Sequence, residues 1–305
     1  MSEQFTQSIL KIHFLQYYSS VLHILYKSGK YNLSYERTSR TITSSSRLLP
    51  DFIIIGYHKC GTTSLYDYIC QHPNIGSASR KEIHYFDLSF WRGIGWYRTH
   101  FPTIYEKNNI EKKTNNKFLT GEASPLYVIH PKIPGRIYDI LPKVKIIILL
   151  RNPVDRAYSH FQNANLANQE SINFEKTIEI DDERWDILLQ NLQSDLIFDH
   201  NMKNFKIPYR SFGKYIEHIK QWYDVFPKEQ IQILTLEELE NDLPGTLKKV
   251  FEFLNVPDFK IKDIEKKNVR KYDKMLPETR KLLIEYYKPY NKKLEEFLNM
   301  KFNWN

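Results

Sequence analysis

The sequence is poor in cysteine, which excludes the class of small domains that depend on disulfides. Among its 305 residues only Cys60 and Cys70 are cysteines, and nine residues separate them. A helix is expected between them, and a helix rises about 1.5 Å per residue, so the two sulfur atoms should lie too far apart to bond. Two cysteines without metal-ligand spacing suit a reducing compartment.

The sequence also lacks any apolar run long enough to cross a membrane, which takes about 18 residues or more. The most apolar N-terminal stretch, 9–26, is interrupted by Lys11, His13 and His23, and it lacks the small-residue cleavage site of a secretory signal. It can form an amphipathic helix that packs on the body of the protein or one that rests on a membrane surface, and we favour the first. We therefore expect a cytoplasmic protein without a membrane span.

Acidic residues are outnumbered by basic ones, 36 to 44, which gives a net charge of +8. A basic excess favours anionic partners such as a nucleotide, a charged polymer, an acidic membrane or nucleic acid, without choosing among them. We expect no nucleic-acid partner. The apolar fraction of 41%, with 21 Tyr and 18 Phe, is enough to fill a sizeable core.

The N-terminal part differs in composition from the rest of the chain. Segment 38–46, TSRTITSSS, is rich in hydroxyl groups and shows no periodicity, which is typical of a linker. We expect residues 1–48 to form an extension and linker, and residues 49–305 to form a single domain.

Within that domain, short apolar runs alternate with helical patterns. The runs at 52–55, 144–150 and 230–234 predict strands buried on both faces. Asn152 can cap a helix whose first turn holds Pro153. Further helices are expected at 62–71, from 236, at 245–254, and at 277–298 with a break at Pro289.

This alternation predicts an α/β fold, a P-loop-like, doubly wound parallel sheet flanked by helices. In such sheets ligands bind beyond the carboxyl ends of the strands. Segments 56–64 and 151–159 both follow a predicted strand directly, so we expect them to face one ligand.

Segment 56–64 has the sequence GYHKCGTTS, and a glycine loop between a strand and a helix is a phosphate cradle. A nucleotide triphosphatase loop would read G-x-x-x-x-G-K-[ST]. Here Gly56 and Gly61 have that spacing, but Thr62 follows them and the lysine is Lys59, inside the loop. A lysine there can reach the bridging oxygen of a shorter phosphosulfate. The loop alone is also compatible with a P-loop nucleotide kinase or with a plain turn that carries a surface lysine.

Four segments together resemble the sulfotransferases that use 3′-phosphoadenosine-5′-phosphosulfate. Residues 59–64, KCGTTS, resemble their 5′-phosphosulfate loop, and residues 151–159, RNPVDRAYS, resemble their 3′-phosphate motif R-x-P-x-x-R-x-x-S. Residues 81–87, KEIHYFD, are similar to the K-E-x-H-F-F-D of the heparan sulfate N- and 3-O-sulfotransferases. Residues 270–272, RKY, are similar to a late nucleotide-binding loop of the N-sulfotransferases. The order of the four segments makes the resemblance specific.

The resemblance implies a role for each matching residue and no metal ion. Lys59 would stabilise the leaving phosphate, and Glu82 would be the general base. In a strand, His84 would share a face with Glu82. It could orient Glu82 or touch the acceptor, although a structural role is equally open. Asp87 could fix His84 or hold an acceptor hydroxyl. The implied nucleotide-binding residues are Lys59, Gly61, Thr62, Thr63, Ser64, Arg151, Ser159, Arg270, Lys271 and Tyr272.

The sequence departs from the family in two places. Segment 121–125, GEASP, has Ala123 where glycosaminoglycan enzymes often carry lysine, and residues 268–270 read NVR where the animal enzymes have Lys-Gly-Arg. The acceptor is therefore expected to be a hydroxyl or amine, with a glycan favoured but its identity open. Trp91, Trp96, Tyr97 and His100 are candidates for an acceptor cleft and equally for the core. The alternatives are the nucleotide kinase and a non-catalytic module that binds anionic glycans.

Overall fold

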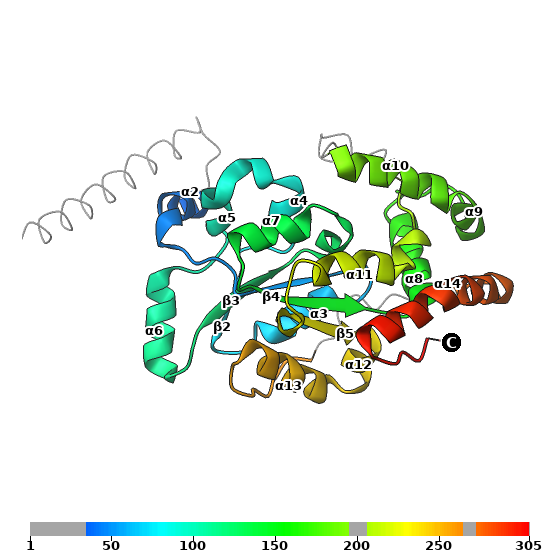
Figure 1. The fold of residues 1–305 in the computed structure, drawn as a ribbon. Helices are drawn as coiled ribbons and strands as arrows, with labels where there is room; N and C mark the ends of the chain where they lie inside the picture. The colour runs from blue at the N-terminus through cyan, green and yellow to red at the C-terminus, as the bar shows by residue number, and fades with distance from the viewer. Residues whose placement is uncertain (1–34, 195–205, 265–272, 305) are drawn as a thin grey trace, which may run out of the picture.

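The computed structural model describes residues 35–194, 206–264 and 273–304. Within them the chain forms one parallel sheet in the order β2-β3-β1-β4-β5 (Figure 1). The strands are β1 (Phe52–Gly56), β2 (Ile75–Ser77), β3 (Leu119–Ala123), β4 (Lys145–Leu150) and β5 (Ile231–Thr235). This confirms the predicted α/β class and parallel sheet.

Helices cover both faces of the sheet. Figure 1 shows α7 (Ile133–Ile140) and α11 (Tyr215–Tyr223) on one side, and α3 (Thr62–Ile69), α12 (Leu236–Asn241) and α13 (Leu243–Leu254) on the other. The remaining α-helices are α2 (Tyr35–Ile42), α4 (Tyr85–Leu88), α5 (Gly93–Arg98), α6 (Ile104–Thr114), α8 (Pro153–Leu166), α9 (Phe174–Glu179), α10 (Asp181–Ser194) and α14 (Pro277–Leu298). Short 3-10 helices are η1 (Ser44–Ser46), η2 (Phe90–Arg92), η3 (Pro125–Ile129), η6 (Ser211–Gly213) and η7 (Lys228–Gln230).

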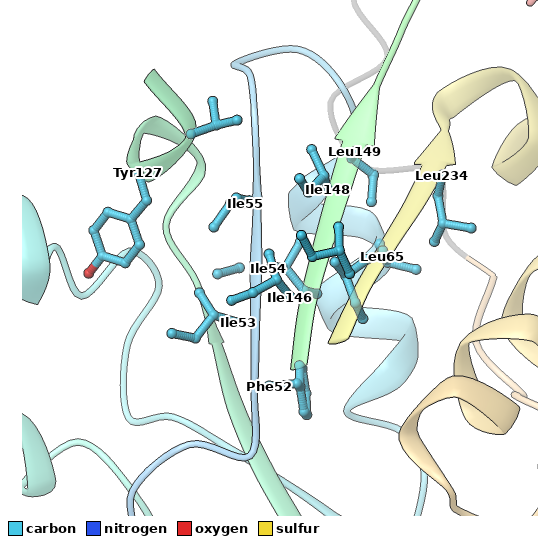
Figure 2. Close-up of a cluster of buried hydrophobic side chains, with 14 of the residues drawn as sticks. Phe52, Ile53, Ile54, Ile55, Leu65, Tyr127, Ile146, Ile148, Leu149 and Leu234 are labelled. Atoms are coloured by element: carbon cyan, nitrogen blue, oxygen red, sulfur yellow. The ribbon is translucent and has the colours of Figure 1, made fainter. Parts of the chain in front are cut away.

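The core lies around the two central strands. Every residue of β1 is buried, and so are the apolar residues of β4 beside it. Figure 2 shows isoleucines of both strands packed between Leu65 of α3 and Tyr127 of η3. Each such side chain stabilises the fold by about 1.5–3 kcal/mol relative to its exposed state. A continuous apolar run is what a strand covered on both faces requires.

The strand order places the expected ligand site between β1 and β4. From β1 the chain crosses to β2 and β3 on one side, and from β4 it continues to β5 on the other side. Adjacent strands whose connections leave in opposite directions mark the switch point of such a sheet, where a crevice opens beyond the carboxyl ends. Segments 56–64 and 151–159 both begin there.

Two strands and one helix differ from the predictions. Strands β2 and β3 were not predicted because they lack apolar runs. In β3, Gly121 lies against Phe52, where a Cβ atom would come within 2.4 Å of its ring. The predicted break at Pro289 is wrong, since α14 continues through it. The buried face of α14, with Leu283, Tyr287 and Leu294, outweighs the one backbone hydrogen bond that proline removes.

The N-terminal extension contacts the body where it is described. Arg40 of α2 donates to the carbonyl of Thr99 (3.1 Å), and Arg47 donates to the carbonyl of Phe101 (2.7 Å). The segment expected as a linker contains α2 and η1, and the domain boundary near residue 48 stays a prediction. Across the described ranges, no helix combines the length and apolarity that a membrane crossing needs.

Candidate active site

The glycine loop after β1 needs both of its glycines. Gly56 has a φ of 145°, and a Cβ atom there would lie 2.4 Å from the carbonyl oxygen of Leu149 on β4. Gly61 has a φ of 87° and is the N-cap of α3. Lys59, between them, also has a positive φ of 73°, which is rare for a residue with a side chain. The sequence spacing therefore encodes a tight backbone turn at the carboxyl end of the central strand β1.

The loop places the N-terminus of α3 at the carboxyl end of β1. Leu65 is bonded to the carbonyl of Gly61 (3.0 Å), so the helix supplies no acceptor for the N–H groups of Thr62, Thr63 and Ser64. These N–H groups and the helix dipole favour an anion at this end. The observed geometry fits the phosphate cradle that the sequence predicted.

The second loop follows β4 and is tied to the first. Arg151 donates from Nη1 to the carbonyl of Lys59 (3.0 Å). Asn152 caps α8, because its Oδ1 accepts from the N–H of Val154 (2.9 Å), and Pro153 occupies the first turn. The predicted cap is confirmed. The two loops therefore meet at the carboxyl ends of β1 and β4, as predicted for a shared ligand.

The buried face of α8 carries a positive charge behind the glycine loop. The guanidinium of Arg156 is fully buried and donates from Nη2 to the carbonyl of Tyr209. Among the described residues its Nε and Nη1 have no hydrogen-bond partner. His160, one turn further, packs on His58 of the loop with ring centroids 5.0 Å apart. Burial, then the charges around it, lowers the pKa of His160 well below its usual value, so this histidine is neutral. Ser159 of the same helix is also buried.

A turn after β2 carries three predicted polar residues. His84 donates from Nε2 to Oε2 of Glu82 (2.9 Å), and its Nδ1 lies 2.8 Å from Oδ2 of Asp87. The chain forms no strand here, so Glu82 and His84 do not share a strand face. His84 has a φ of 56° and is the N-cap of the one-turn helix α4. The turn, rather than a shared strand face, brings Glu82 and His84 together, and Arg80 supports it by donating to the carbonyls of Glu82 (2.9 Å) and Ile83 (3.2 Å).

The electrostatics of this turn favour charged forms. Burial would raise the pKa of Glu82, but the hydrogen bond from His84 and the charges of His58 and Lys81 lower it to about 2. Burial would lower the pKa of His84, but its hydrogen bonds to Asp87 and Glu82 raise it to about 10. At neutral pH Glu82 is therefore a carboxylate bound to an imidazolium. The electrostatic interaction between His58 and Glu82 indicates that the turn lies beside the glycine loop.

Other predicted residues are placed differently or lie outside the described residues. Tyr97 is fully buried and belongs to the core, whereas Trp91 is 79% exposed. Arg270, Lys271 and Tyr272 fall in 265–272, outside the described residues. A cavity of about 390 Å³ beside α8 and α9 is lined by neither the glycine loop nor Glu82, so the site is defined by its loops rather than by that cavity.

A parallel sheet with an anion-binding glycine loop at its switch point defines a phosphate-binding α/β protein. The sulfotransferase domain family matches residues 49–298. The chain belongs to this family, and it is a sulfotransferase.

Three relatives show the extent of the similarity. The membrane-associated sulfotransferase kil1 of Dictyostelium discoideum is 30% identical over 92% of this chain and 72% of the relative. The bifunctional heparan sulfate N-deacetylase/N-sulfotransferase 1 of Caenorhabditis briggsae is 29% identical over 72% of this chain, which spans only 24% of that larger protein. The crystal structure of a sulfotransferase from Alicyclobacillus acidocaldarius has a TM-score of 0.63 and 27% identity, and the match covers 84% of this chain and 98% of that one. Heparan sulfate glucosamine 3-O-sulfotransferases also match, which confirms the resemblance predicted from the motifs.

The expectation of a cytoplasmic protein is wrong. The relative that covers 92% of the chain is named a membrane-associated sulfotransferase. Association with a membrane surface needs no spanning helix, so a sequence without an apolar span does not indicate the cytoplasm.

Proposed function

We propose that this sulfotransferase transfers the sulfuryl group of 3′-phosphoadenosine-5′-phosphosulfate to a hydroxyl or amine of a carbohydrate. The observation that carries the proposal is the position of an ionised Glu82, held by His84, beside a glycine loop whose lysine precedes the second glycine. The first feature supplies a base, and the second supplies a cradle for a phosphosulfate.

The donor nucleotide fits the two loops. The N–H groups at the start of α3 and the hydroxyls of Thr62, Thr63 and Ser64 are suited to the 5′-phosphosulfate. We assign the 3′-phosphate to Arg151 and Ser159, which the family motif pairs. The buried charge of Arg156, which has only one hydrogen bond among the described residues, adds to the positive potential at this edge. Arg270, Lys271 and Tyr272 stay predicted nucleotide ligands.

The chemistry requires a proton acceptor and a stabilised leaving group. The donor supplies a sulfuryl group bound to a phosphate that leaves as a dianion. Glu82 would accept the proton of the acceptor hydroxyl or amine, and Lys59 would neutralise the charge that grows on the leaving phosphate oxygen. A carboxylate of low pKa suffices as the base, because an oxygen that is bonding to sulfur becomes far more acidic than a free hydroxyl. No metal ion takes part in this scheme.

His84 is best assigned as a positioning residue. Both of its ring nitrogens already face carboxylates, Nε2 that of Glu82 and Nδ1 that of Asp87. The ring is therefore committed to orienting Glu82, and Asp87 fixes the ring. Of the two roles that the sequence left open for His84, this arrangement supports orientation of the base over contact with the acceptor.

A carbohydrate acceptor is supported by the relatives. Several are named for heparan sulfate, and one from Mus musculus is named carbohydrate sulfotransferase 15. Ala123 replaces the lysine that the glycosaminoglycan enzymes often carry, so we make no assignment of the polymer.

The proposal is tested by incubating the protein with donor that carries labelled sulfate and a panel of sugars, phenols and amines. Label in a sugar acceptor is the expected result. Label only in phenols would contradict the carbohydrate assignment. A protein that binds anionic glycans and transfers no label to any of them would instead be a non-catalytic module.

A further inference from the structure

We propose that Glu122 is a positioning residue for the reaction, because it fixes the turn that carries Glu82 and His84 through the hydroxyls of Ser124 and Tyr127. This inference rests on the proposed role of Glu82 as the base. The sequence drew attention to segment 121–125 only for its missing lysine, and assigned no function to Glu122.

Glu122 is a fully buried carboxyl group at the end of β3. It faces Ile53 of β1 in the sheet register, and three hydroxyls converge on it. Tyr97 donates to Oε1 (2.5 Å), Ser124 donates to Oε2 (2.7 Å), and Tyr127 lies 3.4 Å from Oε1. A buried carboxyl group with this many donors is satisfied only as an acceptor.

Two of these hydroxyls connect Glu122 to the turn. Ser124 Oγ accepts from the N–H of His84 (3.3 Å). The hydroxyl of Tyr127 accepts from the N–H groups of Tyr85 (2.7 Å) and Phe86 (3.2 Å). Each hydroxyl has a single proton, which it donates in its hydrogen bond to Glu122. The carboxylate therefore turns the lone pairs of both hydroxyls toward the backbone of the turn.

The bonded N–H groups are those that helix α4 most needs to satisfy. They belong to its N-cap and its first two residues, which have no acceptor within the helix. A helix of four residues is unstable by itself, because nucleation costs more than one turn returns. His84 stands at the start of this turn in a left-handed conformation, and Asp87 lies within it. The spacing of His84 from Glu82 and Asp87 thus depends on the buried hydroxyls.

Burial works against the ionised form of Glu122 that this arrangement requires, and the donated hydrogen bonds work for it. Burial raises the pKa of Glu122 to about 7, although the hydrogen bonds from Tyr97 and Ser124 and the charge of His84 act against it. The nearby charge of Asp87 raises it further. An amide in place of the carboxyl group keeps the shape but presents an NH₂ group to one side, so at least one hydroxyl loses its acceptor.

The chain offers a matched control for this network. Tyr97 contacts the same carboxylate, but among the described residues its hydroxyl bonds to no N–H group of the turn. Tyr97→Phe therefore removes a hydrogen bond from Glu122 without releasing α4. Ser124→Ala and Tyr127→Phe remove one link each between Glu122 and the turn, and Glu122→Gln disturbs both.

The experiment is an NMR titration of the His84 side chain in the full-length protein and in these four variants, together with kcat and the KM for the donor. We expect His84 to titrate near pH 10 in the wild type. It should titrate at least about one pH unit lower in Ser124→Ala, Tyr127→Phe and Glu122→Gln, which equals about 1.4 kcal/mol of lost interaction. Their kcat should fall about tenfold to a hundredfold with the donor KM unchanged, as a misplaced base predicts. Tyr97→Phe should keep the wild-type titration and kcat.

Two results would overturn the inference. One is an unchanged titration of His84 in all three linked variants, and the other is an equal shift in Tyr97→Phe. Because the titration does not depend on turnover, it also separates the two proposals. If Glu82 is not the base, the titration still shifts in the linked variants while kcat does not follow it.

Discussion

The sides of this site that we propose for the donor and for the acceptor are built in different ways. The donor side consists of two loops, each directly after a strand, and its main groups are backbone N–H donors and cations. The acceptor side consists of three side chains on a turn outside the sheet. The hydroxyls of Ser124, which follows β3, and of Tyr127 in η3 hold that turn in place. A backbone cradle follows from glycine spacing alone, whereas a side-chain network depends on residues distant in the sequence.

This difference separates the functions of the two sides. Substitutions on the donor side should weaken nucleotide binding, and substitutions on the acceptor side should slow turnover at saturating nucleotide. Each of the following substitutions tests this division between binding and turnover.

The largest effect is expected for Glu82→Gln. Loss of the general base should lower kcat by about 10²- to 10⁴-fold. Affinity for 3′-phosphoadenosine-5′-phosphate should stay nearly intact, because the nucleotide site that we propose lies on the other side. Steady-state kinetics and calorimetry measure the two quantities. Retained turnover would remove Glu82 as the base.

In the proposed scheme Lys59 joins the two sides, because its loop would hold the nucleotide and its charge would stabilise the leaving group. We expect Lys59→Ala to lower kcat by about 10²- to 10³-fold and also to weaken nucleotide binding. Lys59→Gly is the control, since glycine accepts the positive φ of this position at no cost. If glycine restores turnover, strain in the backbone of the alanine variant, and not the missing ammonium, explains the loss.

Arg151 and Ser159 should act on recognition of the 3′-phosphate. Ser159→Ala should reduce the preference for 3′-phosphoadenosine-5′-phosphate over adenosine 5′-monophosphate by about tenfold, or about 1.4 kcal/mol. At saturating donor its kcat should change little. Calorimetric titration with both nucleotides gives the ratio. Equal losses of affinity for the two nucleotides would show that Ser159 does not face the 3′-phosphate.

The last effect concerns stability and pH. The pKa of His84 is raised from 6.5 to about 10, so its contribution is fully present below pH 6.5 and is lost as the pH rises to 10. The pKa of Glu82 is lowered from 4.5 to about 2, so its contribution is present above pH 4.5 and is lost as the pH falls to 2. Urea unfolding at pH 6.5 and pH 10 should show a smaller loss of stability in His84→Gln than in the wild type. An identical loss in both proteins would contradict the charged triad.

Much of the donor side could be predicted from the sequence, because each of its parts is local. The strand that ends at Gly56, the cap at Asn152 and the spacing of Gly56 and Gly61 are all encoded within a few residues. The parallel sheet followed from the apolar runs of β1, β4 and β5. Strand β3 was missed because Gly121 and Glu122 interrupt any apolar pattern. Gly121 leaves room for the ring of Phe52, and Glu122 accepts hydrogen bonds from buried hydroxyls.

For the acceptor side, the sequence could predict which residues take part but not the local structure that holds them. The resemblance named Glu82, His84 and Asp87, but no sequence pattern indicated the turn that the chain forms there. What fixes that turn is the contact between His84 and Ser124, 40 residues apart, and no local pattern reveals such a contact. Location in the cell was also mistaken, since an absent span says nothing about attachment to a membrane surface.

The most direct test of the central claim is a calorimetric titration of the full-length protein with 3′-phosphoadenosine-5′-phosphate and, separately, with ATP and Mg²⁺. A lysine inside the loop and an arginine–serine pair for a 3′-phosphate predict clear binding of the bisphosphate nucleotide and much weaker binding of ATP-Mg²⁺. Binding of ATP-Mg²⁺ with no binding of 3′-phosphoadenosine-5′-phosphate would contradict the account.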